Sequence, residues 1–378
     1  MIYELPGNKV YKVKPLFERL EFQCFCAAAL EGIYPAKVYV DDQSHPSSAF
    51  LVTRGSWAYM AGNPDNIEFI KSLNEALFSG NLLREGVSSL LISCTPPDWH
   101  SKLGQIIQPR EPIRMPRLHY TCIEFTYEWP SKVPKGLEIQ QIEKNMLENE
   151  RDELPDDVRC LILSWDDDDP EERKSFGFVA VENGRILSHA VVDCVVGDVG
   201  EIGLATDPEF QRRGLATVTS AAAVEYGLNR GLRQLVWDCY EHNIPSVHLA
   251  EKLGFKLVNR HDMHFMIFDE FMHNYNLAWF SLETMCYEKT IQVCDTIIKD
   301  SEKTPTDIYF ILACAFAGLG DSAMAFTNLN NAIERGWSSV KELQNSKEWE
   351  YLHGTREWEE LLQSISPHSL NSPETKDS

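Results

Sequence analysis

A polar stretch between an apolar strand and a long helix carries the residues best suited to bind a phosphate. The strand predicted over 199–206 leads into Gln211-Arg212-Arg213-Gly214-Leu215-Ala216, where the helix begins. The first turn of a helix exposes N–H groups that have no intrahelical partner, at the positive end of its dipole. Gly214 allows close backbone approach, and the two arginines add positive charge. We therefore predict a pyrophosphate site at this junction.

A second motif follows downstream, where a predicted strand over 235–239 leads to Asn243-Ile244-Pro245-Ser246. The next helix ends in Lys252-Leu253-Gly254-Phe255. Together the two motifs resemble the GCN5-related N-acetyltransferase (GNAT) superfamily. Its coenzyme motif is written Gln/Arg-x-x-Gly-x-Gly/Ala, and its second motif is Asn-x-x-Ala/Ser before Lys-x-Gly-Phe. The resemblance covers about residues 137–260.

The resemblance implies that an amine attacks the thioester of acetyl-CoA directly, without a metal. Backbone N–H groups near Ala205 and Thr206 would polarise the thioester carbonyl. Asn243 would contact the pantetheine arm, and Ser246 would lie near the coenzyme. The implied coenzyme contacts are Leu204, Ala205, Thr206, Gln211, Arg212, Arg213, Gly214, Leu215, Ala216, Thr217, Asn243 and Ser246.

The attacking amine must lose a proton, and Glu201 lies on the strand where related enzymes often place a basic glutamate. A solvent-facing strand carboxylate is the alternative interpretation of Glu201. The superfamily often has a tyrosine two residues before the motif lysine as the general acid, and Ala250 stands there in this chain. Other groups nearby in the sequence are Cys239, Tyr240, His242 and His248, which the sequence does not rank. A small buried thiol is the more ordinary role for Cys239.

The elements that position these residues belong to a segment over 136–272. An Asn183-Gly184 turn predicts a hairpin. The predicted elements are strands over 137–142, 176–181, 186–195, 199–206 and 235–239 and from Lys256, with helices over 143–165, 215–230 and 246–253.

Residues 1–135 show a similar order, with a predicted helix over Lys14–Leu30 and several strands, of which the last runs over His119–Tyr127. A further helix is predicted from Asn63-Pro64-Asp65, with Asn63 as its cap, to Phe78. No equivalent of the Gln-x-x-Gly motif occurs there. We interpret this segment as a degenerate acetyltransferase-like half. Residues 1–270 resemble, more loosely, a bacterial group of two-part acetyltransferases that includes zwittermicin-type resistance enzymes.

Residues 273–366 lose the strand pattern and predict an all-helical region. Two stretches match at an offset of 35 residues, pairing Ala278 with Ala313, Thr290 with Ala325, Ile291 with Phe326, Cys294 with Leu329, and Ile297 with Ala332. This spacing is typical of tetratricopeptide-like hairpins. Such a region would serve a homodimer or protein contact. The polar residues 367–378 predict a disordered tail.

The sequence therefore predicts an α/β (α+β) GNAT fold in tandem, followed by an all-α region. The predicted boundaries are 1–135 for the degenerate half, 136–272 for the catalytic domain, 273–366 for the helical domain and 367–378 for the tail.

The 378 residues carry a net charge of −22, which argues against nucleic acid or an anionic membrane surface as a partner. The most apolar stretch, over 309–319, is too short to cross a bilayer. The N-terminus lacks the pattern of a signal peptide. Ten scattered cysteines predict buried thiols in a reducing cytoplasm.

Residues 143–172 hold 13 acidic and three basic residues. In the resembling fold this segment flanks the acceptor site, so we expect a cationic amine acceptor. For Asp166–Asp169 the plainer alternative is a solvated loop. His261 and His264 are three residues apart on a predicted strand and face opposite sides, which disfavours a shared metal.

One alternative function belongs to another class. Because the usual tyrosine is missing, the chain could be a coenzyme-binding adaptor with little turnover, whose helical tail binds a protein.

Overall fold

The computed structural model describes residues 1–53, 56–80, 82, 87–148, 154–164, 174–300, 304–356 and 358–362. The chain divides into two compact units, Met1–Phe265 and Met266–Ser378. The acidic run Asp166–Asp169 and the predicted tail over 367–378 lie outside the described residues.

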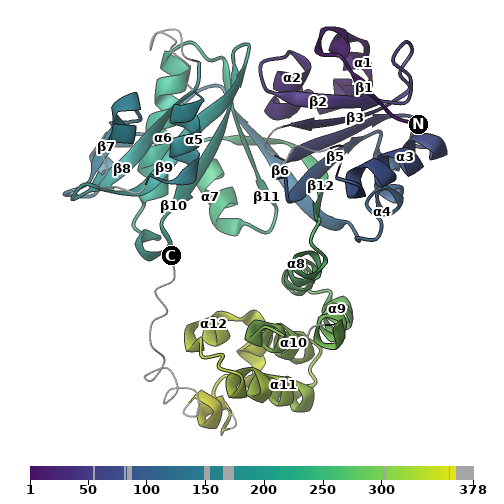
Figure 1. Cartoon of the computed structure of the whole chain (residues 1–378). Helices are drawn as coiled ribbons and strands as arrows, with labels where there is room; N and C mark the ends of the chain where they lie inside the picture. The colour runs from purple at the N-terminus through teal and green to yellow at the C-terminus, as the bar shows by residue number, and fades with distance from the viewer. Residues whose placement is uncertain are drawn as a thin grey trace. The chain divides into compact units, whose positions relative to one another are not determined.

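The first unit is built on one mixed sheet of twelve strands (Figure 1). The strands are β1 Tyr3–Leu5, β2 Ala36–Val40, β3 Ser48–Thr53, β4 Trp57–Gly62, β5 Ser89–Thr95, β6 Ile113–Cys122, β7 Glu138–Gln141, β8 Phe176–Glu182, β9 Arg185–Val196, β10 Val199–Thr206, β11 Gln234–Tyr240 and β12 Lys256–Ile267. Its α-helices are α1 Lys14–Phe17, α2 Cys24–Leu30, α3 Ile67–Phe78, α4 Leu103–Ile106, α5 Asp156–Leu163, α6 Leu215–Asn229 and α7 Ile244–Lys252.

The order of the strands repeats from each edge of the sheet toward its centre. From one edge it runs β1-β2-β3-β4-β5-β12, and from the other it runs β7-β8-β9-β10-β11-β6. The last strand of each half therefore lies beside the other half: β6 pairs with β11, and β12 is a neighbour of β5. Figure 1 shows β6 and β12 in the middle of the sheet. The two halves share one sheet through this exchange.

The elements of the second half follow their sequence signals closely. Asn183 and Gly184 have φ values of 53° and 81°, which is the geometry of the two-residue turn predicted for them. Helix α6 is buried along most of its length, including Ala221 and Ala223, because its small residues pack against Ile202 and Trp237 of the sheet. A small apolar face allows the helix to lie close to the strands.

The helix predicted over Lys14–Leu30 is interrupted. It divides into α1, a 3-10 turn η2 over Glu18–Leu20, and α2. Gln23 is extended (φ −85°, ψ 112°). Its buried amide donates to Ser93 Oγ over 2.9 Å, and that hydroxyl returns a bond of 3.2 Å to Gln23 Oε1. This long-range polar pair stabilises the break, which the local apolar periodicity does not reveal.

Three further expectations need correction. Helix α3 begins at Ile67 and is capped by Asn66, whose Oδ1 accepts from Phe69 N, so the cap is not at Asn63. The strand predicted over 119–127 is β6, which starts earlier and includes Pro116. Eight cysteines are buried as predicted, but Cys160 and Cys286 are exposed.

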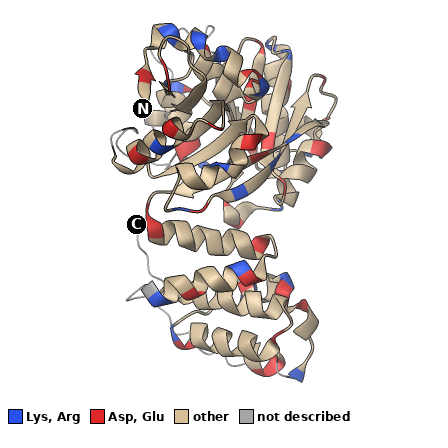
Figure 2. Cartoon of the chain, turned by 90° about the vertical axis from the view of Figure 1, so that its right-hand side faces the viewer, with Lys and Arg blue, Asp and Glu red and all other residues tan. Residues whose placement is uncertain are grey.

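The second unit is helical over its described residues. Its elements are α8 Glu270–Glu283, α9 Tyr287–Asp300, α10 Thr306–Gly318, α11 Ser322–Glu334, α12 Val340–Asn345 and the 3-10 helix η7 Lys347–Leu352. Helix α8 packs on α9, α9 packs on α10, and α10 packs on α11. Figure 2 shows α8 largely free of charge between acidic ends, which are Glu270 and Glu283.

The 35-residue repeat predicted from sequence corresponds to equivalent positions in this unit. Helices α8 and α10 hold Ala278 and Ala313, which are both completely buried. The partners Cys294 and Leu329, in α9 and α11, are also completely buried. The two hairpins therefore bury matching residues.

Within the described residues, no helix is long and apolar enough to span a membrane.

Candidate active site

The loop before α6 has an unusual backbone. Arg212 and Gly214 have φ values of 65° and 82°. Left-handed residues at alternate positions of a turn aim successive N–H groups to one side, which creates a concave anion site. The first helical N–H bonded to a backbone carbonyl is that of Thr217, to Gly214 O over 3.1 Å. The preceding N–H groups of α6 are therefore available to a ligand at the open end of the helix.

The two arginines of this loop differ in their contacts. The Arg213 guanidinium donates to Glu182 Oε1 over 2.6 Å and lies 5.5 Å from the centre of the Phe210 ring. Arg212 is exposed, and no carboxylate partner is recorded for it among the described residues. Arg213 therefore stabilises the loop, while Arg212 is the side chain better placed to meet a phosphate.

Strands β10 and β11 separate in the middle of the sheet. They pair in parallel only from Val199 to Glu201, opposite Gln234 to Val236, and a register irregularity in the β10–β9 pairing follows Glu201. Beyond this point β10 continues to Thr206 beside β9 alone. Its alternate N–H groups, over Leu204 to Thr206, then face a gap where β11 has departed. In the first half, β4 and β5 stay paired from Trp57 to Ala61, so no such gap opens there.

Glu201 lies where the two strands separate and is half-buried. Burial and the nearby negative charge of Asp238 raise the pKa of Glu201 to about 8, although Arg117 opposes this shift. The backbone N–H of Cys24, at the start of α2, hydrogen-bonds to the Glu201 carboxylate. The first half therefore covers the carboxylate of the second half. A carboxyl group with a pKa near 8 is suited to accept a proton from an amine.

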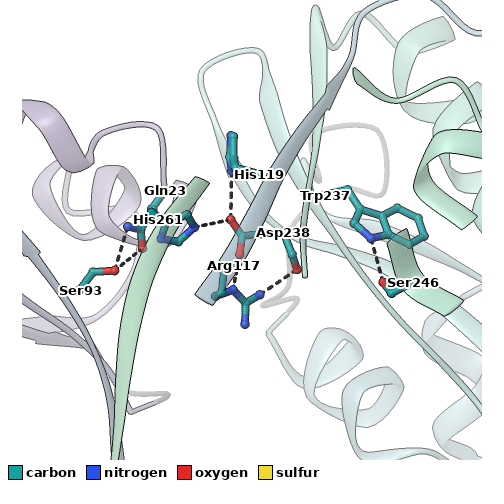
Figure 3. A network of polar contacts seen from close by, with 8 residues as sticks. All are labelled: Gln23, Ser93, Arg117, His119, Trp237, Asp238, Ser246 and His261. Carbon is teal, nitrogen blue, oxygen red and sulfur yellow. Dashed lines mark hydrogen bonds and ion pairs between the residues drawn. The ribbon is translucent and has the colours of Figure 1, made fainter. Parts of the chain in front are cut away.

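Asp238 is the centre of a buried polar network (Figure 3). His119 Nδ1 and His261 Nε2 lie 3.1 and 2.9 Å from its Oδ2. Arg117 Nε donates to Oδ1, and Arg117 Nη2 donates to the Asp238 carbonyl over 2.7 Å. Burial alone would raise the pKa of Asp238, but the two histidines and the guanidinium hold it well below the usual range. Asp238 therefore stays charged beside Glu201.

The opposite side of β11 carries the second motif. Figure 3 shows Trp237 pointing away from the Asp238 network, and its Nε1 donates to Ser246 Oγ over 3.1 Å. Asn243 Oδ1 accepts from Ser246 N over 3.2 Å and caps α7. Both predicted coenzyme contacts thus fix the start of α7. Ala250 is completely buried in the core, and burial raises the pKa of the Cys239 thiol.

The remaining predicted contacts lie around the strand end and the start of α6. Thr206 Oγ1 is 2.8 Å from Ser188 Oγ, which donates to the Ala205 carbonyl over 3.0 Å. Ala205 and Thr206 line a cavity of about 710 Å³. Its wall includes His189, whose Nε2 lies 3.1 Å from Asp157 Oδ2. Leu215 and Thr217 are buried, while Gln211 is exposed in the loop.

A second cavity of about 630 Å³ lies on the Asp238 side of the sheet. Its wall includes Gln23, Arg117 and His261, so it reaches the Asp238 network. Sequence reasoning identified Glu201 but missed Arg117, His119 and Asp238. Arg117 and His119 lie 121 and 119 residues before Asp238 in the chain, and the local signal was a charged residue, Asp238, inside an otherwise apolar strand.

No group of three or more residues able to hold a metal ion occurs among the described positions. His261 contacts Asp238, whereas His264 lies beside His100, with ring centres 4.9 Å apart and the rings tilted by 41°. The two histidines thus have separate surroundings.

Comparison with known proteins identifies the family to which the chain belongs. The GNAT acetyltransferase family model matches residues 14–263, so the chain belongs to this family of acyltransferases. Its match spans both halves of the sheet.

Individual relatives are distant. The chain is 23% identical over 268 residues to the uncharacterized N-acetyltransferase YdfB of Bacillus subtilis (strain 168), covering 70% of this chain and 98% of YdfB. It is 27% identical over 78 residues to the [ribosomal protein bS18]-alanine N-acetyltransferase of Escherichia coli (strain K12), covering 21% and 53% of the two chains. A solved GCN5-related N-acetyltransferase-like protein from Streptococcus suis 89/1591 has 21% identity and a TM-score of 0.49, with 69% and 98% coverage.

Proposed function

We propose that this chain transfers an acetyl group from acetyl-CoA to an amine. The observation that carries the proposal is the separation of β10 and β11 beside Glu201, whose pKa is about 8. The gap gives a thioester access to free strand N–H groups, and Glu201 lies at its closed end. Members of the GNAT family use acetyl-CoA, which supports this donor.

The anionic part of the coenzyme fits the loop before α6. The N–H groups of Gly214, Leu215 and Ala216 and the exposed Arg212 would bind its pyrophosphate. The pantetheine arm would follow the free N–H groups of β10 toward Glu201. Arg213 would act indirectly, through its ion pair with Glu182.

The chemistry at the gap follows from these placements. Glu201 accepts a proton from the amine as the nitrogen forms a bond to the thioester carbon. N–H groups near Ala205 and Thr206 stabilise the negative oxygen that develops. The carbon–sulfur bond then breaks, and the coenzyme A thiolate takes up a proton. Because Ala250 replaces the usual tyrosine, that proton comes from another group or from water.

We further infer that the first half is a second GNAT-like unit without a coenzyme site. Its strand order mirrors that of the second half, which supports this interpretation. Its parallel pair β4 and β5 does not separate, and its α3 is preceded by Asn63-Pro64-Asp65-Asn66 instead of a glycine-containing arginine loop.

The helical unit is proposed to be tetratricopeptide-like, since its two hairpins bury matching residues at the 35-residue offset. Only two such hairpins occur in the described residues, fewer than the roughly three that usually make a stable array. Catalysis is therefore favoured over the adaptor role.

Incubation with acetyl-CoA and a panel of amines, followed by detection of free thiol, tests the proposal. Acetyl-CoA should raise the melting temperature of the wild type, and at least one amine should release thiol. Gly214→Asp places a side chain and a negative charge in the loop at a left-handed position, so it should abolish the thermal shift. Equal shifts in both proteins would refute the proposed coenzyme site.

A further inference from the structure

The cavity of about 630 Å³ beside the Asp238 network is built from both halves of the first unit. The segment around η2 and the start of α2 forms one wall, through Arg19 and Gln23. Strand β12 forms another wall, through Asn259 and His261. A cavity of this volume accommodates a small organic molecule. We call it the Arg19 cavity.

The Arg19 cavity is rich in positive charge although the chain is strongly acidic. Four arginines line it, against two carboxylates. The lining arginines are Arg19, Arg114, Arg117 and Arg260, and the lining carboxylates are Glu241 and Asp262. The chain as a whole has a net charge of −22, so the charge of this cavity lining differs from that of the chain.

Three of the four arginines already have carboxylate partners. Arg114 Nε lies 2.9 Å from Asp262, Arg260 binds Glu241, and Arg117 binds Asp238. Arg19 is exposed and has no carboxylate partner in the part of the chain that the structure describes. Its guanidinium therefore has donors available for a ligand, and it can bind a carboxylate or phosphate through two parallel hydrogen bonds.

His100 adds a second polar group to the same wall. Its Nδ1 is buried and has no hydrogen-bond partner among the described residues. Burial lowers the pKa of His100, so the ring is neutral at pH 7 and can donate or accept one bond.

The cavity also lies close to the base. Gln23 lines it, and the next residue, Cys24, hydrogen-bonds to Glu201 through its backbone. Arg117 lines it and contacts Asp238, the residue whose charge raises the pKa of Glu201. The Arg19 cavity is therefore connected to Glu201 in two ways, through Gln23 and Cys24 and through Arg117 and Asp238.

We propose that the Arg19 cavity holds the acceptor, and that the acceptor carries an anionic group, a carboxylate or a phosphate, which binds Arg19 while its amine faces Glu201. This inference rests on the proposed acetyl transfer. It differs from the expectation of a cationic amine acceptor, which depended on the acidic segment over residues 143–172.

The test compares ligands that differ by one anionic group. Calorimetry would measure binding of N-acetyl amino acids and their carboxamides, and of N-acetylethanolamine and its phosphate ester. A tight guanidinium–anion pair is worth about 1.4 kcal/mol or more, so the wild type should prefer at least one class of anionic ligand about tenfold. Arg19→Gln should remove that preference. Preference for the carboxylate pair or the phosphate pair identifies the group.

Arg233→Gln is the matched control, since Arg233 is an exposed arginine paired with Asp198. It should leave the preference unchanged. Equal or tighter binding of the neutral ligands to the wild type, or an unchanged preference in Arg19→Gln, would overturn the inference.

Two other measurements, the acetyl-CoA thermal shift and thiol release, test the proposed acetyl transfer itself. Absence of both an acetyl-CoA thermal shift and thiol release would refute acetyl transfer, whatever the calorimetry shows. Thiol release with simple polyamines, combined with no anion preference, would support acetyl transfer and reject the Arg19 cavity as an anion site.

Discussion

At the scale of single residues, we expect the proposed base Glu201 to affect activity most. Its raised pKa means that only about a tenth of it is charged at pH 7, so the rate should rise as pH increases through about 8. Glu201→Gln should lower kcat/KM roughly 10²–10⁴-fold, because a general base contributes about that much. A pH–rate profile of both proteins measures the effect.

The control for this prediction is coenzyme binding. Glu201→Gln should keep the acetyl-CoA thermal shift, since Gly214 and Arg212 lie elsewhere. The amine acceptor also titrates, so the decisive comparison is between the two proteins with one acceptor. If the variant keeps both the rate and the rise near pH 8, Glu201 is not the base.

Asp238 has the strongest consequence for stability. Its side chain and that of Arg117 are only 7% and 8% exposed. Removing one partner leaves the other charge buried and unpaired, so Asp238→Asn should lower the free energy of unfolding by about 3–5 kcal/mol. Asp198→Asn, in the exposed pair with Arg233, should cost less than about 1 kcal/mol. Urea unfolding at pH 7 measures both.

The low pKa of Asp238 also predicts how the stability of the folded protein changes with pH. A carboxyl group whose pKa is depressed by folding stabilises the protein above its unfolded pKa, and this stability is lost as pH falls through the folded value. The difference between wild type and Asp238→Asn should therefore shrink in acid. Joint replacement of Arg117 and Asp238 by apolar residues should recover much of the loss. Similar losses for Asp238→Asn and Asp198→Asn would contradict the buried-network argument.

Sequence alone predicted the residues whose roles depend on neighbours in the chain. The turn and helix start over Gln211–Thr217 are local signals, because turn chemistry and helix starts depend on a few adjacent residues. The Asp238 network is different. Arg117, His119 and His261 reach Asp238 only through pairing of β6, β11 and β12. No local pattern indicates such pairing.

At the scale of elements, the exchange of β6 and β12 makes the two halves dependent on each other. Residues 136–265 alone lack β6, so the β11 edge loses Leu118, Tyr120 and Cys122 from its core. A protein made of residues 136–265 alone should therefore show no cooperative thermal unfolding. Residues 1–268, which keep both exchanged strands, are the control and should unfold cooperatively. A folded monomer of 136–265 in circular dichroism and gel filtration would contradict the exchange.

The bounds of single strands and helices were predicted well where local sequence decides them, and less well where a long-range contact does. Strand β10 was predicted over 199–206 and helix α6 over 215–230, and both are observed within a residue. The continuous helix over 14–30 was wrong, because the Gln23–Ser93 pair stabilises an extended residue there. That break forms one wall of the Arg19 cavity. Local periodicity thus identified the scaffold and missed a position where a long-range contact shapes the candidate site.

At the scale of the whole molecule, every residue of the proposed site belongs to the first unit. The coenzyme loop, Glu201 and the Arg19 cavity all lie within Met1–Phe265. Residues 1–268 should therefore keep the acetyl-CoA thermal shift and the thiol release of the full chain. A ligand present at 100 times its Kd stabilises a protein by about 2.7 kcal/mol, and this amount should be equal in the two forms.

Comparison of residues 1–268 with the full chain also distinguishes an enzyme from a coenzyme-binding adaptor. If catalysis is the function, removal of the helical unit leaves kcat/KM within about twofold, because no reacting group is lost. If the helical unit instead supplies part of the site, the truncated chain keeps its cooperative unfolding but loses the shift or the turnover. An adaptor gives a third result: both forms bind acetyl-CoA equally, and neither releases thiol with any amine. The melting curve and the thiol assay together separate these three outcomes, because one reports coenzyme binding and the other reports acetyl transfer.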